Sequence, residues 1–223
     1  TGNLTEEEAK TLLDDILGNL PEGEVTPVQK VSPKNLGKVF HVKSSIPQSF
    51  VLFFQEGLDT SHQDFIPLFM LLDIMGSPGD MASRLMEELR VKNSLVYSVY
   101  VGVSALTYSP LIKGSFQTEN KSVNKAMTLL KKQWTDLKTK GITQEELNKV
   151  KQKLIGHYPL NFQSSRDIAD AMLEYQLTGR PITYFADRQQ QIEAVTLEQI
   201  NEVASKVINP KNLTFILVGP TGS

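Results

Sequence analysis

The sequence predicts an α+β fold in which helices pack on one face of a mostly antiparallel sheet. Stretches with the period of a strand and stretches with the period of a helix occur in blocks and do not alternate strictly along the chain. Two strand-like stretches, 95–103 and 111–117, follow each other closely, as in an antiparallel hairpin. The chain has 223 residues, 40% of them hydrophobic, which is enough for a large core.

The composition excludes several classes of protein and site. Cysteine is absent, which rules out disulfides, a thiolate nucleophile and cysteine-ligated zinc. The formal net charge is -2, whereas proteins that bind nucleic acid usually carry a strong basic excess, so we expect no nucleic-acid partner. No apolar run is long enough to span a bilayer. The absence of cysteine does not fix the compartment, because a periplasmic protein can also lack cysteine.

The first 21 residues are predicted to contain one helix and its stop. Thr5 and Glu8 are spaced as a capping box, so the helix is expected to begin there and to reach residue 17. Its apolar residues recur at helical spacing and are expected to form a buried stripe: Ala9, Leu12, Leu13, Ile16 and Leu20. Residues 22–36 contain two prolines among polar side chains, which indicates an extended linker. Because no signal peptide precedes the helix, we expect a fragment or a processed piece.

Residues 38–43 and 49–55 are predicted to be strands. The second contains five consecutive apolar residues, 50–54, and is therefore expected to be central in the sheet and covered on both faces. Residues 61–75 are predicted to form an apolar helix with Ser61 as its N-cap, and residues 76–79 form a loop by composition.

A short helix is predicted to end near residue 90. Met81, Leu85 and Leu89 recur at a spacing of four and would line one face of it, and Arg90 would lie at its end. The dipeptide that starts at Asn93 then breaks the helix, because a short polar side chain can bond the local backbone.

A strand is predicted over residues 95–103, where apolar residues alternate. The alternation places Tyr97 on one face together with three valines: Val99, Val101 and Val103. The sharp corner between helix and strand would bring Arg90 and Tyr97 together, so that a guanidinium and a phenol point hydrogen-bond donors into one space. Residues 111–117 form the next strand, and residues 107–110 form the hairpin turn between the two.

From residue 121 the chain is predicted to be mostly helical. Expected helices cover residues 121–140, 143–158 and 165–178, and shorter ones follow Pro181 and Thr196. Thr143 and Glu146 are spaced as a second capping box. Residues 212–218 close the chain as a strand. Arg84 is expected to be structural and to pair with a glutamate of its own helix, Glu87 or Glu88.

The stretch around the predicted corner resembles one family, the pitrilysin/insulinase-type (inverzincin) zinc metallopeptidases, which include the mitochondrial processing peptidases and bacterial relatives. The matching segments are 76–79, 83–85, 89–90 and 95–99, with looser matches at 50–55, 64–75, Gly114 and 213–219. The resemblance is to the C-terminal half of one subunit. It implies paired α+β domains that enclose a chamber for unfolded peptides. Residues 1–21 would then be a terminal helix left from a preceding N-terminal domain, and residues 37–223 the C-terminal substrate-binding domain.

The resemblance also implies roles for two residues. In the family an Arg and a Tyr seven residues apart reach into the active site, and the matching residues here are Arg90 and Tyr97. The phenol would hydrogen-bond a substrate carbonyl or the tetrahedral oxyanion, and the Arg would bind peptide backbone or hold the phenol in place. Considered without the resemblance, the two residues are an ordinary cation at a helix end and an ordinary strand tyrosine.

The zinc site of the family lies in its N-terminal domain, on a His-x-x-Glu-His motif that this chain lacks. The histidines His41, His62 and His157 have no histidine partner at ligand spacing. We therefore expect no metal ligand in this chain and no hydrolysis by it alone. Zinc is expected in a partner, either an N-terminal zinc-bearing domain or a second peptidase subunit, in a homodimer or heterodimer that acts on a peptide substrate.

Two other functions stay open from the sequence. One is a non-catalytic structural or assembly subunit that keeps the fold and has no part in proteolysis. The other is a stand-alone peptide-binding module, which would bind peptides with no partner present.

Overall fold

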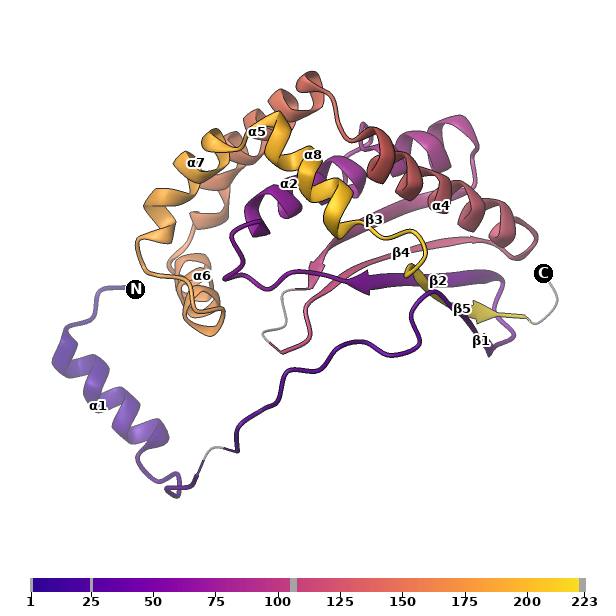
Figure 1. Cartoon of the computed structure of the whole chain (residues 1–223). Helices are drawn as coiled ribbons and strands as arrows, with labels where there is room; N and C mark the ends of the chain where they lie inside the picture. Colours follow the sequence, from indigo (N-terminus) through magenta and orange to yellow (C-terminus); the bar gives the residue numbers. More distant parts are fainter. Residues whose placement is uncertain (1, 25, 105–107, 221–223) are drawn as a thin grey trace.

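The computed structural model describes residues 2–24, 26–104 and 108–220, and these residues form a five-stranded sheet with helices packed on one face (Figure 1). The strands run in the order β1-β5-β2-β4-β3. Their bounds are Val39–Lys43 (β1), Gln48–Glu56 (β2), Val96–Ser104 (β3), Leu111–Glu119 (β4) and Thr214–Gly219 (β5). Only the β1–β5 pair is parallel among these strands, so the prediction of a mostly antiparallel sheet is confirmed.

The helical layer is built from segments before and after the β3–β4 hairpin. Its helices are α2 (Phe65–Gly76), α3 (Arg84–Met86), α4 (Val123–Lys140), α5 (Gln144–His157), α6 (Ser165–Leu177), α7 (Tyr184–Ala194) and α8 (Leu197–Val207). Figure 1 shows α2, α4 and α8 above the sheet, with α6 and α7 beyond its left end. No helix among the described residues is long and apolar enough to cross a membrane.

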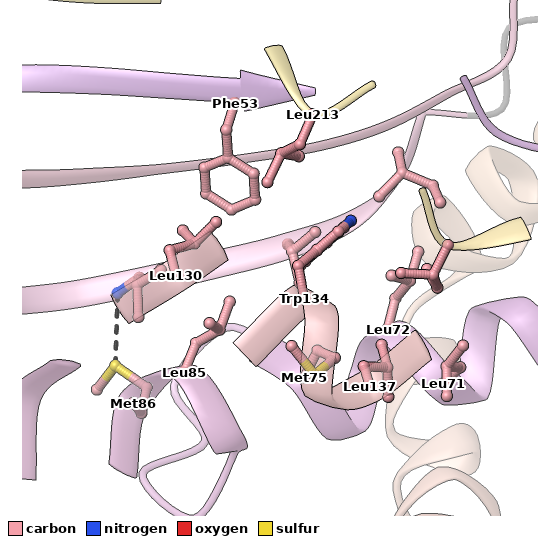
Figure 2. Close-up of a cluster of buried hydrophobic side chains, with 14 of the residues drawn as sticks. Phe53, Leu71, Leu72, Met75, Leu85, Met86, Leu130, Trp134, Leu137 and Leu213 are labelled. Atoms are coloured by element: carbon pink, nitrogen blue, oxygen red, sulfur yellow. Dashed lines mark hydrogen bonds between the residues drawn. The ribbon is translucent and has the colours of Figure 1, made fainter. Parts of the chain in front are cut away.

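The core lies between the sheet and this helical layer. Trp134 of α4 is completely buried, and its ring meets that of Phe53 edge-on, with 5.9 Å between centroids. Figure 2 shows Trp134 packed among Phe53, Leu213, Met75 and Leu137, which come from separate segments of the chain. The apolar spacing that predicts α4 is therefore the spacing of residues that face this core.

The central position predicted for β2 is confirmed, but its two faces differ. Val51 and Phe53 are buried beneath the helices. Phe50, Leu52 and Phe54 point to the other face, which no helix of the described residues covers, and they are only half-buried. The expectation that β2 is covered on both faces is wrong, because five consecutive apolar residues do not reveal whether a second layer exists.

Two predicted helix starts are wrong, for local reasons. The helix α2 begins at Phe65, since the Ser61 hydroxyl donates to the Asp59 carboxylate at 2.6 Å and does not cap the helix. The helix α3 begins at Arg84, so Met81 precedes it and stays 46% exposed. The capping boxes predicted at Thr5 and Thr143 are both present.

The N-terminal helix α1 (Glu6–Leu17) forms as predicted, but its apolar stripe is not buried. Leu12 is 51% exposed and Ile16 is 64% exposed, because α1 stands apart from the sheet (Figure 1). The described residues of the 22–36 linker form no helix or strand, and Val31 N donates to Tyr108 O of the hairpin connection at 2.8 Å. Of the predicted hairpin turn, residue 107 lies outside the described residues.

Candidate functional site

The corner between helix and strand is built by the backbone of residues 87–95. After α3 the chain forms a π-helical turn, Glu87–Lys92, and Ser94 then adopts the left-handed conformation with φ of 53°. Ser94 N donates to Arg90 O at 2.9 Å, and Leu95 N donates to Leu89 O at 2.8 Å. The break predicted at Asn93-Ser94 is thus confirmed. The π-helical turn was not predicted; such turns are rare and often occur at functional sites.

The first residues of β3 contain a β-bulge. Val96 lies opposite Thr118 and Val99 opposite Phe116, so β3 has one residue more than β4 over this interval. Val99 N donates to Met86 Sδ at 3.4 Å. Val96 and Val99 are both buried, whereas Tyr97 is 81% exposed. The prediction that Tyr97 shares a face with Val99 is therefore wrong, because the extra residue reverses the faces of the strand before Val99. The predicted alternation of Val99 and Val101, both buried, with the exposed Tyr100 is present.

Arg90 and Tyr97 lie together at this corner. The guanidinium carbon of Arg90 is 4.7 Å from the centroid of the Tyr97 ring. Arg90 Nη1 lies 3.3 Å from Met81 Sδ, and no carboxylate of the described residues is within ion-pair distance of the guanidinium. Stacking of this kind at an exposed site stabilises by roughly 0.5–1 kcal/mol. The predicted proximity is observed; the role of the two residues in catalysis stays a prediction.

Tyr97 lines a groove of about 610 Å³ over the first part of β3. Phe50 and Tyr100 contribute aromatic surface, and Gln117 contributes an amide. In the described part of the chain, no hydrogen bond occupies the Tyr97 hydroxyl. The groove therefore offers aromatic surface and polar side chains beside an available phenol donor, which suits an extended polar chain better than a compact apolar ligand.

The described residues provide no metal centre, since no group of three or more His, Asp or Glu side chains could hold an ion. The histidines come from separate parts of the chain: His41 is in β1, His62 precedes α2 and His157 ends α5. His62 Nδ1 instead accepts a hydrogen bond from Asp64 N at 3.1 Å. Hydrolysis through zinc would require ligands from outside the described residues.

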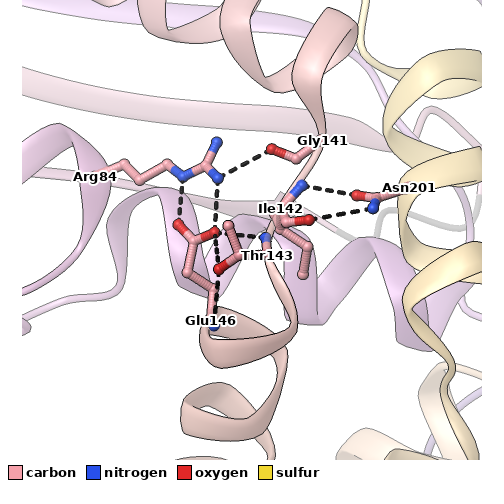
Figure 3. Close-up of polar contacts among 6 residues, drawn as sticks. All are labelled: Arg84, Gly141, Ile142, Thr143, Glu146 and Asn201. Carbon is pink, nitrogen blue, oxygen red and sulfur yellow. Dashed lines mark hydrogen bonds and ion pairs between the residues drawn. The ribbon is translucent and has the colours of Figure 1, made fainter.

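Arg84 anchors the corner to the helical layer (Figure 3). Its Nε and Nη2 atoms lie 2.6 Å and 2.8 Å from the two oxygens of Glu146, and Nη2 also donates to Gly141 O at 2.9 Å. A structural role was predicted correctly, but its partner is Glu146 of α5 and not a glutamate of its own helix. The sequence carries no signal for a pairing across 62 residues.

The Glu146 carboxylate also closes the α5 capping box with Thr143 (Figure 3). Burial by itself raises the pKa of this carboxyl, but hydrogen bonds from Arg84 and Thr143 outweigh burial and hold the pKa below its usual 4.5. A depressed pKa means that folding favours the ionised form. The stabilisation is therefore present above the usual pKa and is lost as the pH falls through the lower pKa of the folded state.

We expect Glu146→Gln to lower the free energy of unfolding by about 1.5–3 kcal/mol at pH 7, because the neutral amide has one acceptor oxygen and cannot form the two-oxygen ion pair with Arg84. The difference between the two proteins should shrink as the pH falls below 4.5, because the unfolded carboxyl takes up a proton first and the folded one follows at its lower pKa. Urea denaturation at pH 7 and pH 3 measures both. Glu145→Gln is the matched control, since Glu145 is exposed and contacts Lys149 only at the surface. Equal losses in the two variants, or a loss independent of pH, would contradict the assigned contact.

A protein-family model matches most of the chain. The family model described as "Peptidase M16 inactive domain" matches residues 1–154. This agrees with the absence of a metal-binding group from the described residues.

Individual proteins resemble the chain over most of its length. A Helicobacter pylori (strain ATCC 700392 / 26695) protein named "Non-peptidase homolog YmxG" is 28% identical over 220 residues, which cover 97% of this chain and 50% of the relative. A Bacillus subtilis (strain 168) protein named "Uncharacterized zinc protease YmxG" is 24% identical over 181 residues, which cover 81% of this chain and 44% of the relative. The chain therefore spans about half the length of the curated relatives it matches.

A solved structure shows the same fold. The crystal structure of a peptidase M16 inactive domain from Pseudomonas fluorescens superposes with a TM-score of 0.86 at 24% identity. The match covers 100% of this chain and 52% of that chain. The arrangement of sheet and helices described above is thus found in a solved structure.

Proposed function

The chain belongs to the peptidase M16 family as an inactive domain, and on this premise we propose that it is the substrate-binding portion of a zinc-dependent metalloendopeptidase that cleaves unfolded peptides. It contributes Arg90 and Tyr97 to an active site whose zinc and general base lie elsewhere. The observation that carries this proposal is the bulge that turns Tyr97 outward beneath the Arg90 guanidinium.

The geometry suits stabilisation of a developing negative charge. The guanidinium stacked on the ring restricts the orientation of the phenol, so less freedom is lost when a substrate binds. The hydroxyl can donate to a peptide carbonyl or to the oxyanion formed when water attacks it. Arg90 has further N–H groups for the peptide backbone.

The domain organisation forms part of the same proposal. Residues 1–21 hold a terminal helix that packs with a preceding N-terminal domain, residues 22–36 link it, and residues 37–223 form the substrate-binding domain. The exposed stripe of α1, with Ile16 64% exposed and Leu20 66% exposed, supports this division. The zinc-bearing partner is that N-terminal domain or a second subunit of a homodimer or heterodimer. The match covers 50% and 44% of the two curated relatives, so each relative has room for a further domain beside the matched part.

Tyr97→Phe tests the proposal in the assembled enzyme that contains the zinc-bearing part. We expect kcat/KM for an unfolded peptide to fall at least about tenfold, since the ring stays beneath Arg90 while one hydrogen bond to a charged oxygen, worth roughly 1.5–3 kcal/mol, is lost. The matched control is Tyr108→Phe, since Tyr108 is also exposed but does not line the groove. Unchanged turnover in a folded Tyr97→Phe enzyme would contradict the proposed role.

A second candidate is a non-catalytic assembly subunit, and the name of the Helicobacter pylori relative, a non-peptidase homolog, favours it. Under this alternative the assembly forms normally with Tyr97→Phe and its peptidase turnover, where there is any, does not depend on the phenol. The same kinetic comparison therefore separates the two functions.

A further inference from the structure

A second pocket lies on the helical side of the sheet, at the end of β3 opposite Tyr97. Its volume is about 350 Å³, and Val101, Gly102 and Val103 are among the residues that line it. Tyr97 and Val103 are six residues apart, or roughly 20 Å along a strand, and lie near opposite ends of β3. The pocket is therefore separate from the groove that Tyr97 lines.

The walls of this pocket are aromatic, and two arginines lie against them. Five rings from α2, α6, α7 and the turn after α5 line it: Phe65, Phe69, Tyr158, Tyr175 and Tyr184. Arg180 and Arg188 line it as well, and we call it the arginine–aromatic pocket.

Arg180 is held by rings and not by a close carboxylate. Its guanidinium carbon lies 4.6 Å from the Tyr184 centroid and 5.1 Å from the Phe65 centroid. The side chain is only 14% exposed, and its nearest ion-pair partner among the described residues, Glu174, is 4.0 Å away and 66% exposed. No hydrogen bond from the Arg180 guanidinium to another described residue is present.

Arg188 has a similar setting. Its guanidinium carbon lies 4.4 Å from the Tyr158 centroid and 5.9 Å from the Phe69 centroid. One long hydrogen bond joins Nη1 to Leu154 O at 3.4 Å, and within the described ranges no carboxylate pairs with this guanidinium.

The donors of these arginines are accessible from the pocket. Each guanidinium carries five N–H groups in a planar fork that matches a carboxylate. Among the described residues, no fully buried polar side-chain atom lacks a hydrogen-bond partner, so the guanidinium nitrogens without a partner keep some contact with solvent, and both side chains line the pocket.

Some other polar groups of the pocket are already paired. The Asp73 carboxylate is bound by Lys153 at 2.7 Å, and the Tyr158 and Tyr175 hydroxyls are 2.8 Å apart. Burial, and then the bond to Tyr175, raise the pKa of the Tyr158 phenol, which therefore stays neutral. Glu174 is the remaining acidic residue of the lining, and its carboxylate is largely in solvent. Ser77, Asn161 and Tyr184 add neutral polar groups to the lining. The charged hydrogen-bonding groups that stay available inside the pocket are therefore the two guanidiniums, which are set among aromatic rings.

We propose that the arginine–aromatic pocket binds a carboxylate carried on an apolar or aromatic group, which is the chemistry of the C-terminal residue of a peptide. The guanidiniums bind the carboxylate and the rings cover the apolar part of the ligand. This site does not depend on Arg90, Tyr97 or zinc, so it can be tested whether or not the proposed peptidase function holds.

The test uses the full 223-residue chain and a fluorescently labelled peptide that ends in phenylalanine with a free carboxylate. Fluorescence anisotropy should show saturable binding, and amidation of the same C-terminus should weaken the affinity at least about tenfold, because the carboxylate is lost. Unlabelled N-acetylphenylalanine distinguishes two sources of the carboxylate. If N-acetylphenylalanine displaces the labelled peptide at similar affinity, a small free acid is a sufficient ligand. If it does not displace the peptide, the pocket requires the end of a peptide. Equal affinity of the acid and the amide, or no binding of either, overturns the proposal.

Substitutions test whether the peptide binds at the arginine–aromatic pocket. Arg188→Gln should weaken the binding of the peptide with a free carboxylate at least about tenfold. Arg166→Gln should leave that affinity unchanged, because Arg166 is 89% exposed and lies outside the pocket. If Arg188→Gln does not fold, Arg188→Lys keeps the charge and should still weaken binding, since an ammonium lacks the planar fork. Undiminished affinity in a folded Arg188 variant overturns the assignment of the site.

Discussion

Replacing Trp134 with alanine is expected to lower the free energy of unfolding by about 3–5 kcal/mol, a large share of the stability of an ordinary domain. The side chain is completely buried, and the shortened residue would leave a cavity between the sheet and the helical layer. Its Nε1 also donates to Gln55 Oε1 at 2.7 Å, within a core where Gln55 is 1% exposed. The substitution therefore removes ring packing and one of the partners of a buried amide.

Urea denaturation followed by circular dichroism measures this loss, since Trp134 is the single tryptophan and its fluorescence disappears with it. Lys132→Ala on the same helix is the matched control and should change the free energy of unfolding by less than about 0.5 kcal/mol. Trp134→Phe should fall between the two, because it keeps a ring and loses the N–H donor. A Trp134→Ala loss equal to that of Lys132→Ala would show that the core is not packed as described.

Gly114→Ala is expected to destabilise the fold by about 3 kcal/mol, because β3 and β4 approach closely at this glycine. A Cβ at residue 114 would lie 2.3 Å from Tyr100 O and 2.3 Å from Phe53 Cζ. The first of these atoms belongs to the backbone of the neighbouring strand, so the ladder itself has to move. Because Tyr97 is on that strand, the groove should be displaced as well.

The control is a Gly→Ala substitution at a glycine where an added Cβ would meet no other atom. Gly156 is exposed in α5, and a Cβ there meets no atom within 4 Å. Gly156→Ala should therefore stabilise the protein by up to about 1 kcal/mol, through the higher helix propensity of alanine. Thermal unfolding of both variants measures the two changes in stability, which should have opposite signs. A neutral Gly114→Ala would contradict the close approach of β3 and β4.

The elements that the sequence predicts well are those whose causes are local. The capping boxes at Thr5 and Thr143 each need residues only three positions apart. The break at Asn93-Ser94 and the β3–β4 hairpin also depend on neighbouring residues. The proximity of Arg90 and Tyr97 was predictable for the same reason, since one sharp corner separates them.

Prediction failed where a distant segment decides the outcome. The bulge that exposes Tyr97 adds a residue to one strand relative to its neighbour, and it is accompanied by the contact of Val99 N with Met86, 13 residues away. The pairing of Arg84 with Glu146 joins two helices. The arginine–aromatic pocket combines α2, α6 and α7, so no single stretch of sequence reveals it.

The sequence by itself therefore determined the α+β class, the order of elements, the family and the two residues at the corner. Periodicity and capping act over a few residues, and the segments that carry the family resemblance most closely all lie between residues 76 and 99. Only the tertiary structure decided which faces are covered, including the exposed stripe of α1 and the open face of β2. Burial depends on what packs against a side chain, and that packing brings together residues far apart in the chain.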